Sequence, residues 1–333
     1  MANVAINGFG RIGRAALKVI LETPELDLVA INDIVPVDNL AYLLKYDTVY
    51  GKYEKSVEVD GDNLIVDGLE FPVYKERDPA QLPWEELDVD IALECTGFFT
   101  QGEDLKKHLE AGADYVLLSA PAKSEDVPTI VHGVTSSDDD MRMVSCASCT
   151  TNCITPVVEV LGRRLGIKKA IMTTIHAYTS SQAIVDSPAK KIRRGRAGAA
   201  NFVPTSTGAA VATTKALPQY AGKFDGVAVR GPVPDGSLAD MVFLVERETT
   251  VEEVNQIFKE EAETEQYQGI LGVTEDPIVS TDIIGDPHAS LVDLGMTQVV
   301  DGDLIKVMSW YDNEWGFTNQ MIREAVRLAK EIG

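Results

Sequence analysis

The part of the chain before residue 149 alternates short apolar runs with stretches in which apolar residues recur every three to four positions. Short apolar runs bounded by turn residues are typical of buried strands, and the longer periodicity is typical of amphipathic helices. The predicted strands are residues 4–7, 26–32, 91–95 and 115–119, and the predicted helices are residues 11–22 and 103–111. This alternation predicts a parallel, doubly wound α/β sheet.

Beyond residue 149 the predicted strands become longer, and several alternate apolar with polar residues. Such alternation is typical of a largely antiparallel sheet with one covered face. The predicted strands are residues 170–177, 226–231, 239–247, 290–299 and 304–310. Helices are predicted at 154–165, at 251–263 after a Thr250–Glu253 capping box, and at 317–332. At roughly 150 residues per domain, 333 residues predict two domains with a boundary near residue 148.

Charge narrows the set of partners. The chain has 52 acidic and 30 basic residues, a net charge of −22. We therefore expect no nucleic-acid partner and no membrane-surface partner. Such an excess is best tolerated where salt screens it, which suggests a high-salt cytoplasm; an ordinary acidic cytosolic protein is the alternative.

The sequence shows neither a signal peptide nor an apolar run of about 18 residues, so we expect no membrane span. Four cysteines are too few for a disulfide scaffold, and reduced thiols in the cytoplasm are the expectation.

A glycine-rich turn follows the first predicted strand. Gly8, Gly10 and Gly13 form the pattern G-x-G-x-x-G, which opens the first predicted helix, and Asp33 ends the next strand. This context is typical of a Rossmann dinucleotide site, in which the pyrophosphate lies at the helix N-terminus and the acid binds a ribose hydroxyl. The alternative is a tight turn with an incidental acid. Thr96 and Ser119 follow two further strands at the same edge of the sheet, where ligands bind in such folds.

Asp33 favours NAD over NADP. A 2′-phosphate about 4 Å from its carboxylate would cost up to ~4 kcal/mol per charge pair at an effective dielectric constant of ~20. Arg11 and Arg77 are cations that can offset part of this repulsion.

Three cysteines, Cys146, Cys149 and Cys153, lie in the segment SCASCTTNC. A structural zinc site needs four ligands, and the chain has no second C-x-x-C and no suitably spaced histidines, so we expect no metal. A redox pair lacks the usual sequence setting. Cys149 precedes the predicted helix 154–165 and is expected at or near its N-terminus, where the dipole favours a thiolate. It is the candidate nucleophile. Cys146 and Cys153 are predicted to be packing residues.

A base and an anion site complete the candidate chemistry. His176 ends a strand and is the candidate proton acceptor, although a lone histidine is more often structural. The basic run 190–196 suits either a phosphate or an intersubunit ion pair, and residues 205–209 can offer hydroxyls and N–H groups to a phosphate. Arg230 lies in an apolar strand and needs an anionic partner, which is either a ligand or a structural carboxylate.

Five blocks now form a recognisable set: NGFGRIGR, SCASCTTNC, TTIHAYT, RRGRAGAANFVPTSTGAA and WYDNEWGF. In this order they resemble the phosphorylating glyceraldehyde-3-phosphate dehydrogenases of the bacterial and eukaryotic type, over nearly the whole chain. The resemblance implies a Rossmann-type domain at 1–148 and an α+β catalytic domain with a mostly antiparallel sheet at 149–315. It also implies a last helix, about 316–333, that returns to the first domain, and a homotetramer in which the loop 179–202 packs near a neighbour's cofactor.

The same resemblance implies a chemistry. Cys149 attacks the aldehyde of glyceraldehyde 3-phosphate, His176 takes the proton, hydride passes to NAD, and inorganic phosphate cleaves the thioester. The residues implied to bind the two phosphates are Ser148, Thr150, Thr179, Arg194, Thr207, Gly208 and Arg230. Those implied to bind the dinucleotide are Gly8, Gly10, Arg11, Ile12, Gly13, Asp33, Arg77, Thr96, Ser119 and Asn313. Ser187 is a small polar residue, and in this respect the chain resembles family members that accept NADP.

Three alternatives remain at this stage. An erythrose-4-phosphate dehydrogenase shares the motifs but hydrolyses its acyl-enzyme with water. A nucleotide-binding regulatory protein would keep the fold without the chemistry, and a metal-binding redox protein would contain stoichiometric zinc or iron.

Overall fold

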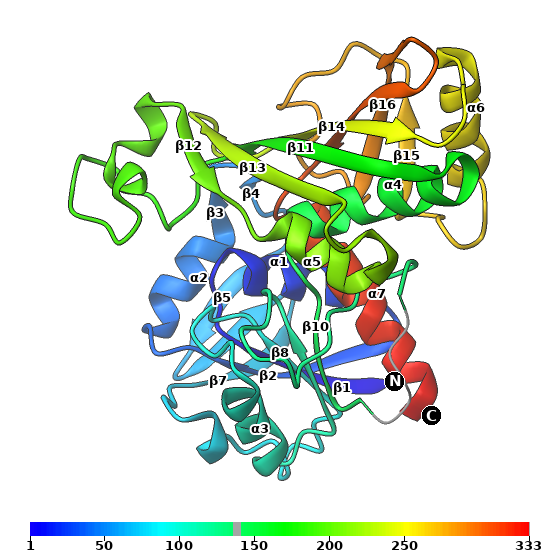
Figure 1. Ribbon diagram of the computed structural model, residues 1–333. Helices are drawn as coiled ribbons and strands as arrows, with labels where there is room; N and C mark the ends of the chain where they lie inside the picture. Colours follow the sequence, from blue (N-terminus) through cyan, green and yellow to red (C-terminus); the bar gives the residue numbers. More distant parts are fainter. Residues whose placement is uncertain (136–140, 333) are drawn as a thin grey trace. The chain divides into compact units, whose positions relative to one another are not determined.

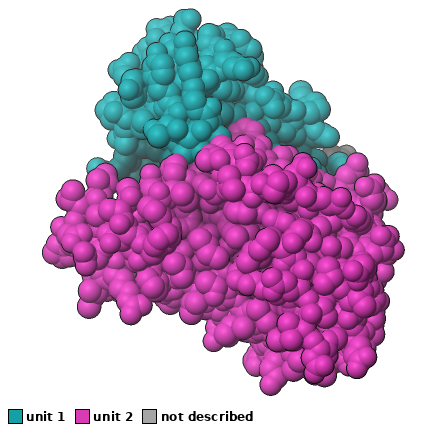
Figure 2. All heavy atoms as spheres, turned by 90° about the horizontal axis from the view of Figure 1, so that it is seen from above, with its two compact units in different colours: residues 1–132, 136–147, 318–333 teal, residues 133–135, 148–317 magenta. Residues whose placement is uncertain are grey.

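The computed structural model describes residues 1–135 and 141–332 (Figure 1). The chain forms two compact units, coloured separately in Figure 2: unit 1 contains residues 1–132, 136–147 and 318–333, and unit 2 contains residues 133–135 and 148–317. Most of the last helix, from Thr318 onward, therefore groups with the N-terminal part of the chain. No described helix has both the length and the apolar character needed to cross a membrane.

Unit 1 is built on the predicted parallel sheet. Its strands are β1 (Ala2–Asn7), β2 (Leu26–Asn32), β7 (Leu69–Tyr74), β8 (Ile91–Glu94), β9 (Tyr115–Leu118) and β10 (Met143–Ser145), in the order β10-β9-β8-β1-β2-β7. All of these neighbours pair in parallel. Its helices are α1 (Arg11–Ile20), α2 (Val37–Lys45), α3 (Gly102–Glu110) and most of α7 (Trp315–Ile332). The prediction of a parallel α/β sheet is confirmed.

Sequence analysis missed the antiparallel end of this sheet. β5 (Val57–Asp60) and β6 (Asn63–Val66) extend it beyond β7 through two hairpins. Asp67 and Gly68 connect β6 to β7, and both have positive φ, +53° and +82°. Two such residues in succession are typical of a type I′ turn, and Asp-Gly is a strong hairpin signal in a sequence. A short two-stranded pair, β3 (Tyr46–Asp47) and β4 (Gly51–Lys52), lies nearby in the chain.

Unit 2 contains the predicted, mostly antiparallel sheet. Its order is β12 (Val203–Ser206), β13 (Phe224–Gly231), β11 (Ile167–Ala177), β14 (Ser237–Val245), β17 (Leu304–Tyr311), β16 (Ser290–Val300) and β15 (Leu271–Thr274). β11 pairs in parallel with β13, and β15 in parallel with β16; the other neighbours are antiparallel. Figure 1 shows β11, β13 and β14 side by side above α4.

The helices of unit 2 are α4 (Cys149–Leu165), α5 (Ala209–Ala216) and α6 (Val251–Ala262). α4 and α6 contact the sheet and share one hydrophobic core with it. Thr250 caps α6 by accepting from Glu253 N at 3.2 Å, as predicted. The Glu253 carboxylate instead binds Arg247 and Thr249 Oγ1. The described residues also form four short 3-10 helices: η1 (Pro79–Gln81), η2 (Ile192–Gly195), η3 (Gly198–Ala200) and η4 (Pro218–Tyr220).

Candidate functional site

The glycine-rich turn between β1 and α1 cannot accept side chains at two of its positions. Gly8 has φ +94°, and a Cβ there would lie 2.6 Å from Thr96 N. A Cβ on Gly13 would lie 2.1 Å from Gly8 O, so this glycine lets helix and strand approach each other. Gly10, the N-cap of α1, has only open space around its Cβ position. The helix N-terminus is therefore accessible to a phosphate.

A cavity of about 400 Å³ lies against this turn, entirely within unit 1. Its walls include five residues predicted to bind a dinucleotide: Gly8, Gly10, Asp33, Arg77 and Thr96. Asp33 accepts from Phe9 N at 2.7 Å through Oδ2 and from Val35 N at 3.0 Å through Oδ1. A carboxylate has about four lone-pair sites, so Asp33 can still accept from two ribose hydroxyls. These features fit a dinucleotide.

Other predicted cofactor residues have different surroundings. Arg11 bonds the buried carboxylate of Asp47 and lies 5.5 Å from the centre of the Tyr50 ring, so its charge is already balanced within unit 1. This ion pair reduces the positive charge that Arg11 can offer against the repulsion between Asp33 and a 2′-phosphate. The residues that line the cavity do not include Ile12, Gly13 or Ser119. Asn313 belongs to unit 2, where its Oδ1 accepts from Ser237 Oγ at 2.5 Å.

Sequence analysis missed the polar network behind the cavity. Asn7 and Asn32 line it, and Asn32 Nδ2 donates to Asn7 Oδ1 at 2.7 Å. Asn7 Nδ2 donates to the fully buried carboxylate of Glu94 at 2.6 Å, and His108 Nε2 lies 3.1 Å from the same oxygen. Trp84 Nε1 can only donate, so it makes His108 Nδ1 an acceptor and leaves the proton on Nε2, toward Glu94. Asparagines at the ends of β1 and β2 were the available signal.

In unit 2, Cys149 is the first residue of α4, as predicted. Ser148 is the N-cap, and its hydroxyl accepts from Thr151 N at 3.2 Å. The helix continues through Pro156 to Leu165. Thr150 is buried, and its hydroxyl lies 2.9 Å from the hydroxyl of Tyr311. This cap orients the first turn and presents Cys149 at its start.

The structure brings Cys149 and His176 together. Cys149 Sγ lies 3.4 Å from His176 Nε2, and His176 Nδ1 lies 2.8 Å from Ala177 O. When Nδ1 carries the proton and donates to Ala177 O, the lone pair of Nε2 faces the thiol. The Tyr311 ring packs edge-on against the imidazole, with ring centres 5.9 Å apart. Tyr311 also bonds Thr174 Oγ1 at 2.7 Å and so holds the imidazole in place.

Electrostatics in this site differ from the expectation of a free thiolate. Burial raises the pKa of Cys149 to about 11, while Arg230 and bonds to Thr150 act in the opposite direction. Burial, followed by the Arg230 charge, lowers the pKa of His176 to about 3. Burial of Cys149 therefore acts against the stabilisation of a thiolate by the helix N-terminus. The resting pair is a thiol beside a neutral imidazole, in position to exchange one proton.

Three cations gather around this pair. Arg230 Nη1 lies 2.8 Å from His176 Nδ1 and 3.0 Å from Ala177 O. Because arginine only donates, it bonds Ala177 O when Nδ1 is protonated. The buried Nε of Arg230 has no hydrogen-bond partner among the described residues. Arg194 bonds Thr205 Oγ1 at 3.1 Å and Ser181 Oγ at 3.3 Å, and Lys191 bonds Ser206 Oγ at 2.8 Å. Neighbouring cations lower the pKa of both Lys191 and Arg230, after burial, which is the larger cause. Among the described residues, no carboxylate pairs with Lys191, Arg194 or Arg230, so the structure gives no support to the salt-bridge alternative for Arg230. We call these residues the cation cluster.

The remaining residues predicted to bind phosphate are Thr179, Thr207 and Gly208. Thr179 Oγ1 lies 2.8 Å from Ser181 Oγ, which also bonds Arg194. Thr207 Oγ1 accepts from Ala209 N at 3.1 Å, and Gly208 is the N-cap of α5. Sequence analysis did not single out Lys191 within the basic run 190–196. Arg196 of the same run pairs with Asp186 and is not part of the cluster.

The other two cysteines of the SCASCTTNC segment are buried, as predicted for packing residues. Cys146 and Cys153 are 5% and 0% exposed, and burial is the main cause that raises the pKa of each. All four cysteines are free thiols. Among residues 1–135 and 141–332, no group of three histidine, cysteine or acidic side chains is placed to hold a metal ion.

Comparison with known proteins agrees with this geometry. Residues 2–102 match the family model "Glyceraldehyde 3-phosphate dehydrogenase, NAD binding domain", and residues 148–313 match the model of the C-terminal domain of the same family. The chain is 47% identical to a glyceraldehyde-3-phosphate dehydrogenase of Zymomonas mobilis, over 99% of both chains. It is 49% identical to glyceraldehyde-3-phosphate dehydrogenase 1 of Bacillus subtilis and 48% identical to the enzyme of Geobacillus stearothermophilus, over 98% of each chain. The chain belongs to the glyceraldehyde-3-phosphate dehydrogenase family.

Proposed function

We propose that this chain oxidises D-glyceraldehyde 3-phosphate and joins the product to inorganic phosphate, giving 1,3-bisphosphoglycerate. Family membership makes it an NAD-dependent oxidoreductase. The observation that carries the proposal is the 3.4 Å contact between Cys149 Sγ and His176 Nε2, beside the cation cluster. A nucleophile, a base and a site for two phosphates are the parts that this reaction needs.

In the proposed first step, Cys149 Sγ attacks the aldehyde carbon. The thiol proton passes to His176 Nε2 and then to the carbonyl oxygen, which gives a thiohemiacetal on Cys149. His176 next removes the hydroxyl proton as a hydride leaves the same carbon. NAD, when bound, supplies the hydride acceptor. General-base assistance of this kind contributes ~10²–10⁴-fold in rate.

The thioester that results is cleaved by inorganic phosphate. A phosphate oxygen attacks the thioester carbon, the C–S bond breaks, and the sulfur recovers its proton from His176. The cation cluster suits both the substrate phosphate and this nucleophile, with Ser148, Thr150, Thr179, Thr207 and Gly208 as further donors. An anion there would also offset the Arg230 charge that lowers the pKa of His176. We infer that substrate binding makes His176 a better base.

The cavity of unit 1 suits NAD better than NADP. Two carboxylates, Asp33 and Glu76, line it together with one cation, Arg77. A 2′-phosphate would meet more negative than positive charge there. Asp33 is proposed to bind the ribose, and Gly8, Gly10 and the start of α1 to bind the pyrophosphate. Asn313, fixed by Ser237, is proposed to orient the nicotinamide carboxamide.

A homotetramer in the cytoplasm is the proposed state. The loop 179–202 exposes large apolar side chains, with Ile184 at 88% and Ile192 at 87%. On the sheet face opposite α4, Ile171 and Val227 are also exposed. Apolar groups exposed in this number favour association with further copies. Light scattering should give the mass of four chains.

Initial rates with glyceraldehyde 3-phosphate, with and without phosphate, test the proposed reaction. We expect NAD reduction that depends on phosphate and that falls by roughly 10⁴-fold or more in Cys149→Ser. Turnover without phosphate and a preference for erythrose 4-phosphate would identify the alternative dehydrogenase. No NAD reduction with either sugar would indicate a regulatory protein. A salt series in the same assay tests the expected high-salt environment.

A further inference from the structure

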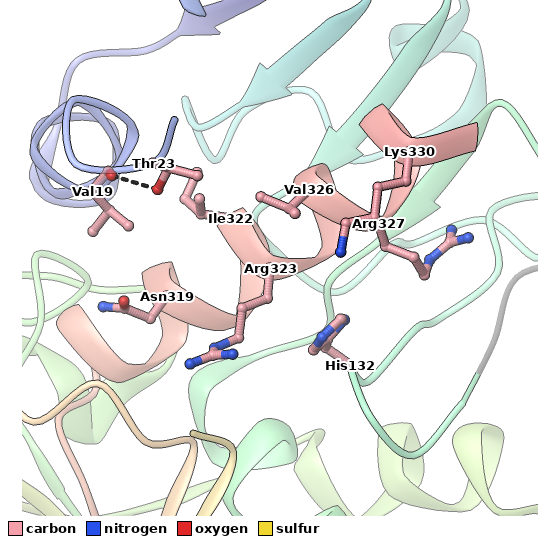
Figure 3. Close-up of a pocket in the computed structure, with 9 residues that line it drawn as sticks. All are labelled: Val19, Thr23, His132, Asn319, Ile322, Arg323, Val326, Arg327 and Lys330. Carbon is pink, nitrogen blue, oxygen red and sulfur yellow. Dashed lines mark hydrogen bonds between the residues drawn. The ribbon is translucent and has the colours of Figure 1, made fainter. Parts of the chain in front are cut away.

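A second cavity, of about 410 Å³, lies elsewhere in unit 1 (Figure 3). One wall is α7, which contributes Asn319, Ile322, Arg323, Val326, Arg327 and Lys330. Val19 and Thr23, at the end of α1, and His132 form the rest. Its volume is within the ~300–1,000 Å³ typical of small-molecule sites. No step of the proposed reaction uses it.

The cations of this cavity are on one helix. Arg323, Arg327 and Lys330 are spaced i, i+4 and i+7, so they share one face of α7. The neighbouring carboxylates, Glu324 and Glu331, both pair with Arg327, and Glu324 also bonds His132 at 2.9 Å. Among the residues that the structure describes, neither Arg323 nor Lys330 has a carboxylate partner. In a chain with 52 acidic and 30 basic residues, two unpaired cations in one cavity are unusual.

Structural roles account for only part of this arrangement. Lys330 is in the last turn of α7, where a cation complements the helix dipole. Arg323 is near the middle of the helix, where the dipole gives no such benefit. It is partly buried, and burial alone lowers its pKa. A partly buried guanidinium without an anion costs stability, and this cost suggests that a ligand supplies the anion.

We propose that this cavity binds a small organic phosphate of about the size of a nucleoside monophosphate. The guanidinium of Arg323 can bind a phosphate group through two N–H groups, and the ammonium of Lys330 adds a second positive charge to the lining of the cavity. Val19, Ile322 and Val326 form apolar walls for a ring or chain. Asn319 and His132 can bond to its polar edge. The site is separate from the dinucleotide cavity, with which it shares no lining residue.

The probe is AMP, added to the enzyme in saturating NAD so that the dinucleotide cavity is occupied. Isothermal titration calorimetry should show one AMP per chain. We expect at least a tenfold loss of affinity in Arg323→Gln, and a similar loss when adenosine replaces AMP. The control is Lys106→Gln, which removes one positive charge from an exposed position of α3 and should bind AMP normally. No turnover is needed, so the result is independent of the proposed reaction.

Three results would overturn the proposal: no AMP binding in the presence of NAD, equal binding by Arg323→Gln, or equal binding of adenosine. Arg323→Gln should melt at the same or a higher temperature than the wild type, since it removes an unpaired cation. If that variant is unstable, Lys330→Gln gives the same test from an exposed position. AMP should raise the melting temperature of the wild type and of Lys106→Gln, but not that of Arg323→Gln.

Discussion

The two candidate sites of this chain differ in whether their charged side chains are paired. Near the dinucleotide cavity of unit 1, two ionic groups have partners: Arg11 has Asp47, and Glu94 accepts from Asn7 and Thr96. In unit 2, Lys191, Arg194 and Arg230 have no described carboxylate partner. The first site is organised to hold a ligand through backbone shape and hydroxyl acceptors. The second keeps positive charge unbalanced, which suits ligands that are themselves anions.

The two units also differ in how a buried histidine holds its proton. His108 in unit 1 is fixed in one tautomer by Trp84 and Glu94 and has no solvent exposure. His176 in unit 2 faces a thiol on one side, and both a carbonyl and a guanidinium on the other. A histidine with competing partners can gain or lose a proton during a reaction, whereas a histidine held in one tautomer by fixed partners has a structural role. Substitutions of three residues, His176, Asp33 and Lys191, test this contrast.

The largest expected effect is on turnover in His176→Gln. Without the base, kcat/KM should fall by ~10²–10⁴-fold. Because thiolate formation at neutral pH depends on Nε2, alkylation of Cys149 by iodoacetamide should also slow at pH 7. His108→Gln is the control, since among the described residues His108 bonds Trp84 and Glu94 and no cysteine thiol. Equal loss of activity in both variants, with both folded, would remove the proposed distinction between the two histidines.

The next effect is on acid stability. The pKa of His176 falls from about 6.5 in the unfolded chain to about 3 in the folded one. Between these values the unfolded chain binds the extra proton, so the free energy of unfolding decreases as the pH falls through this window. Each pH unit should cost up to ~1.4 kcal/mol, or up to ~3 kcal/mol from pH 6.5 to pH 4. Urea unfolding should show a shallower pH dependence in His176→Gln; parallel curves for the two proteins would contradict the assignment.

Asp33→Asn tests the effect of the negative charge in the dinucleotide cavity. It removes the carboxylate that repels a 2′-phosphate, and it keeps a side-chain oxygen able to accept a hydrogen bond from a ribose hydroxyl. We expect the ratio of kcat/KM for NAD to that for NADP to fall ~10–100-fold, less than the full Coulomb term because the cavity is open to water. Asp27→Asn, at an exposed position of β2, is the matched control. An unchanged ratio would mean that Ser187 or another residue sets the cofactor preference.

These contrasts show which parts of the molecule a sequence can predict. The glycine pattern, Asp33 and the position of Cys149 at a helix start follow from local rules, and the structure has them. Burial is not local: the depth at which α4 packs raises the pKa of Cys149, and no pattern in SCASCTTNC encodes that depth. Pairing across the fold is equally hidden. Asp47 is 36 positions from Arg11, and no local pattern in the sequence predicts that the two residues form an ion pair.

Lys191 shows the same limit within one short run. Lys190 and Lys191 are adjacent and chemically identical, so composition cannot distinguish them. In the structure only Lys191 bonds Ser206. Burial, followed by the charges of Arg194 and Arg230, lowers the pKa of Lys191. Lys190 is exposed. The fold therefore gives one of the two lysines a place in the cation cluster.

The smallest expected effect uses this pair. Lys191→Gln should raise the KM for inorganic phosphate or for the triose phosphate by about 3–10-fold, because an exposed charge-assisted bond is worth only ~1 kcal/mol. Lys190→Gln removes the same charge one residue away and should leave both KM values within about twofold, and kcat should change little in either variant. Adding salt should narrow the difference between the two variants, since screening weakens the attraction of Lys191 for phosphate. If Lys190→Gln raises KM as much as Lys191→Gln, the effect comes from net charge alone, and the cation cluster reduces to Arg194 and Arg230.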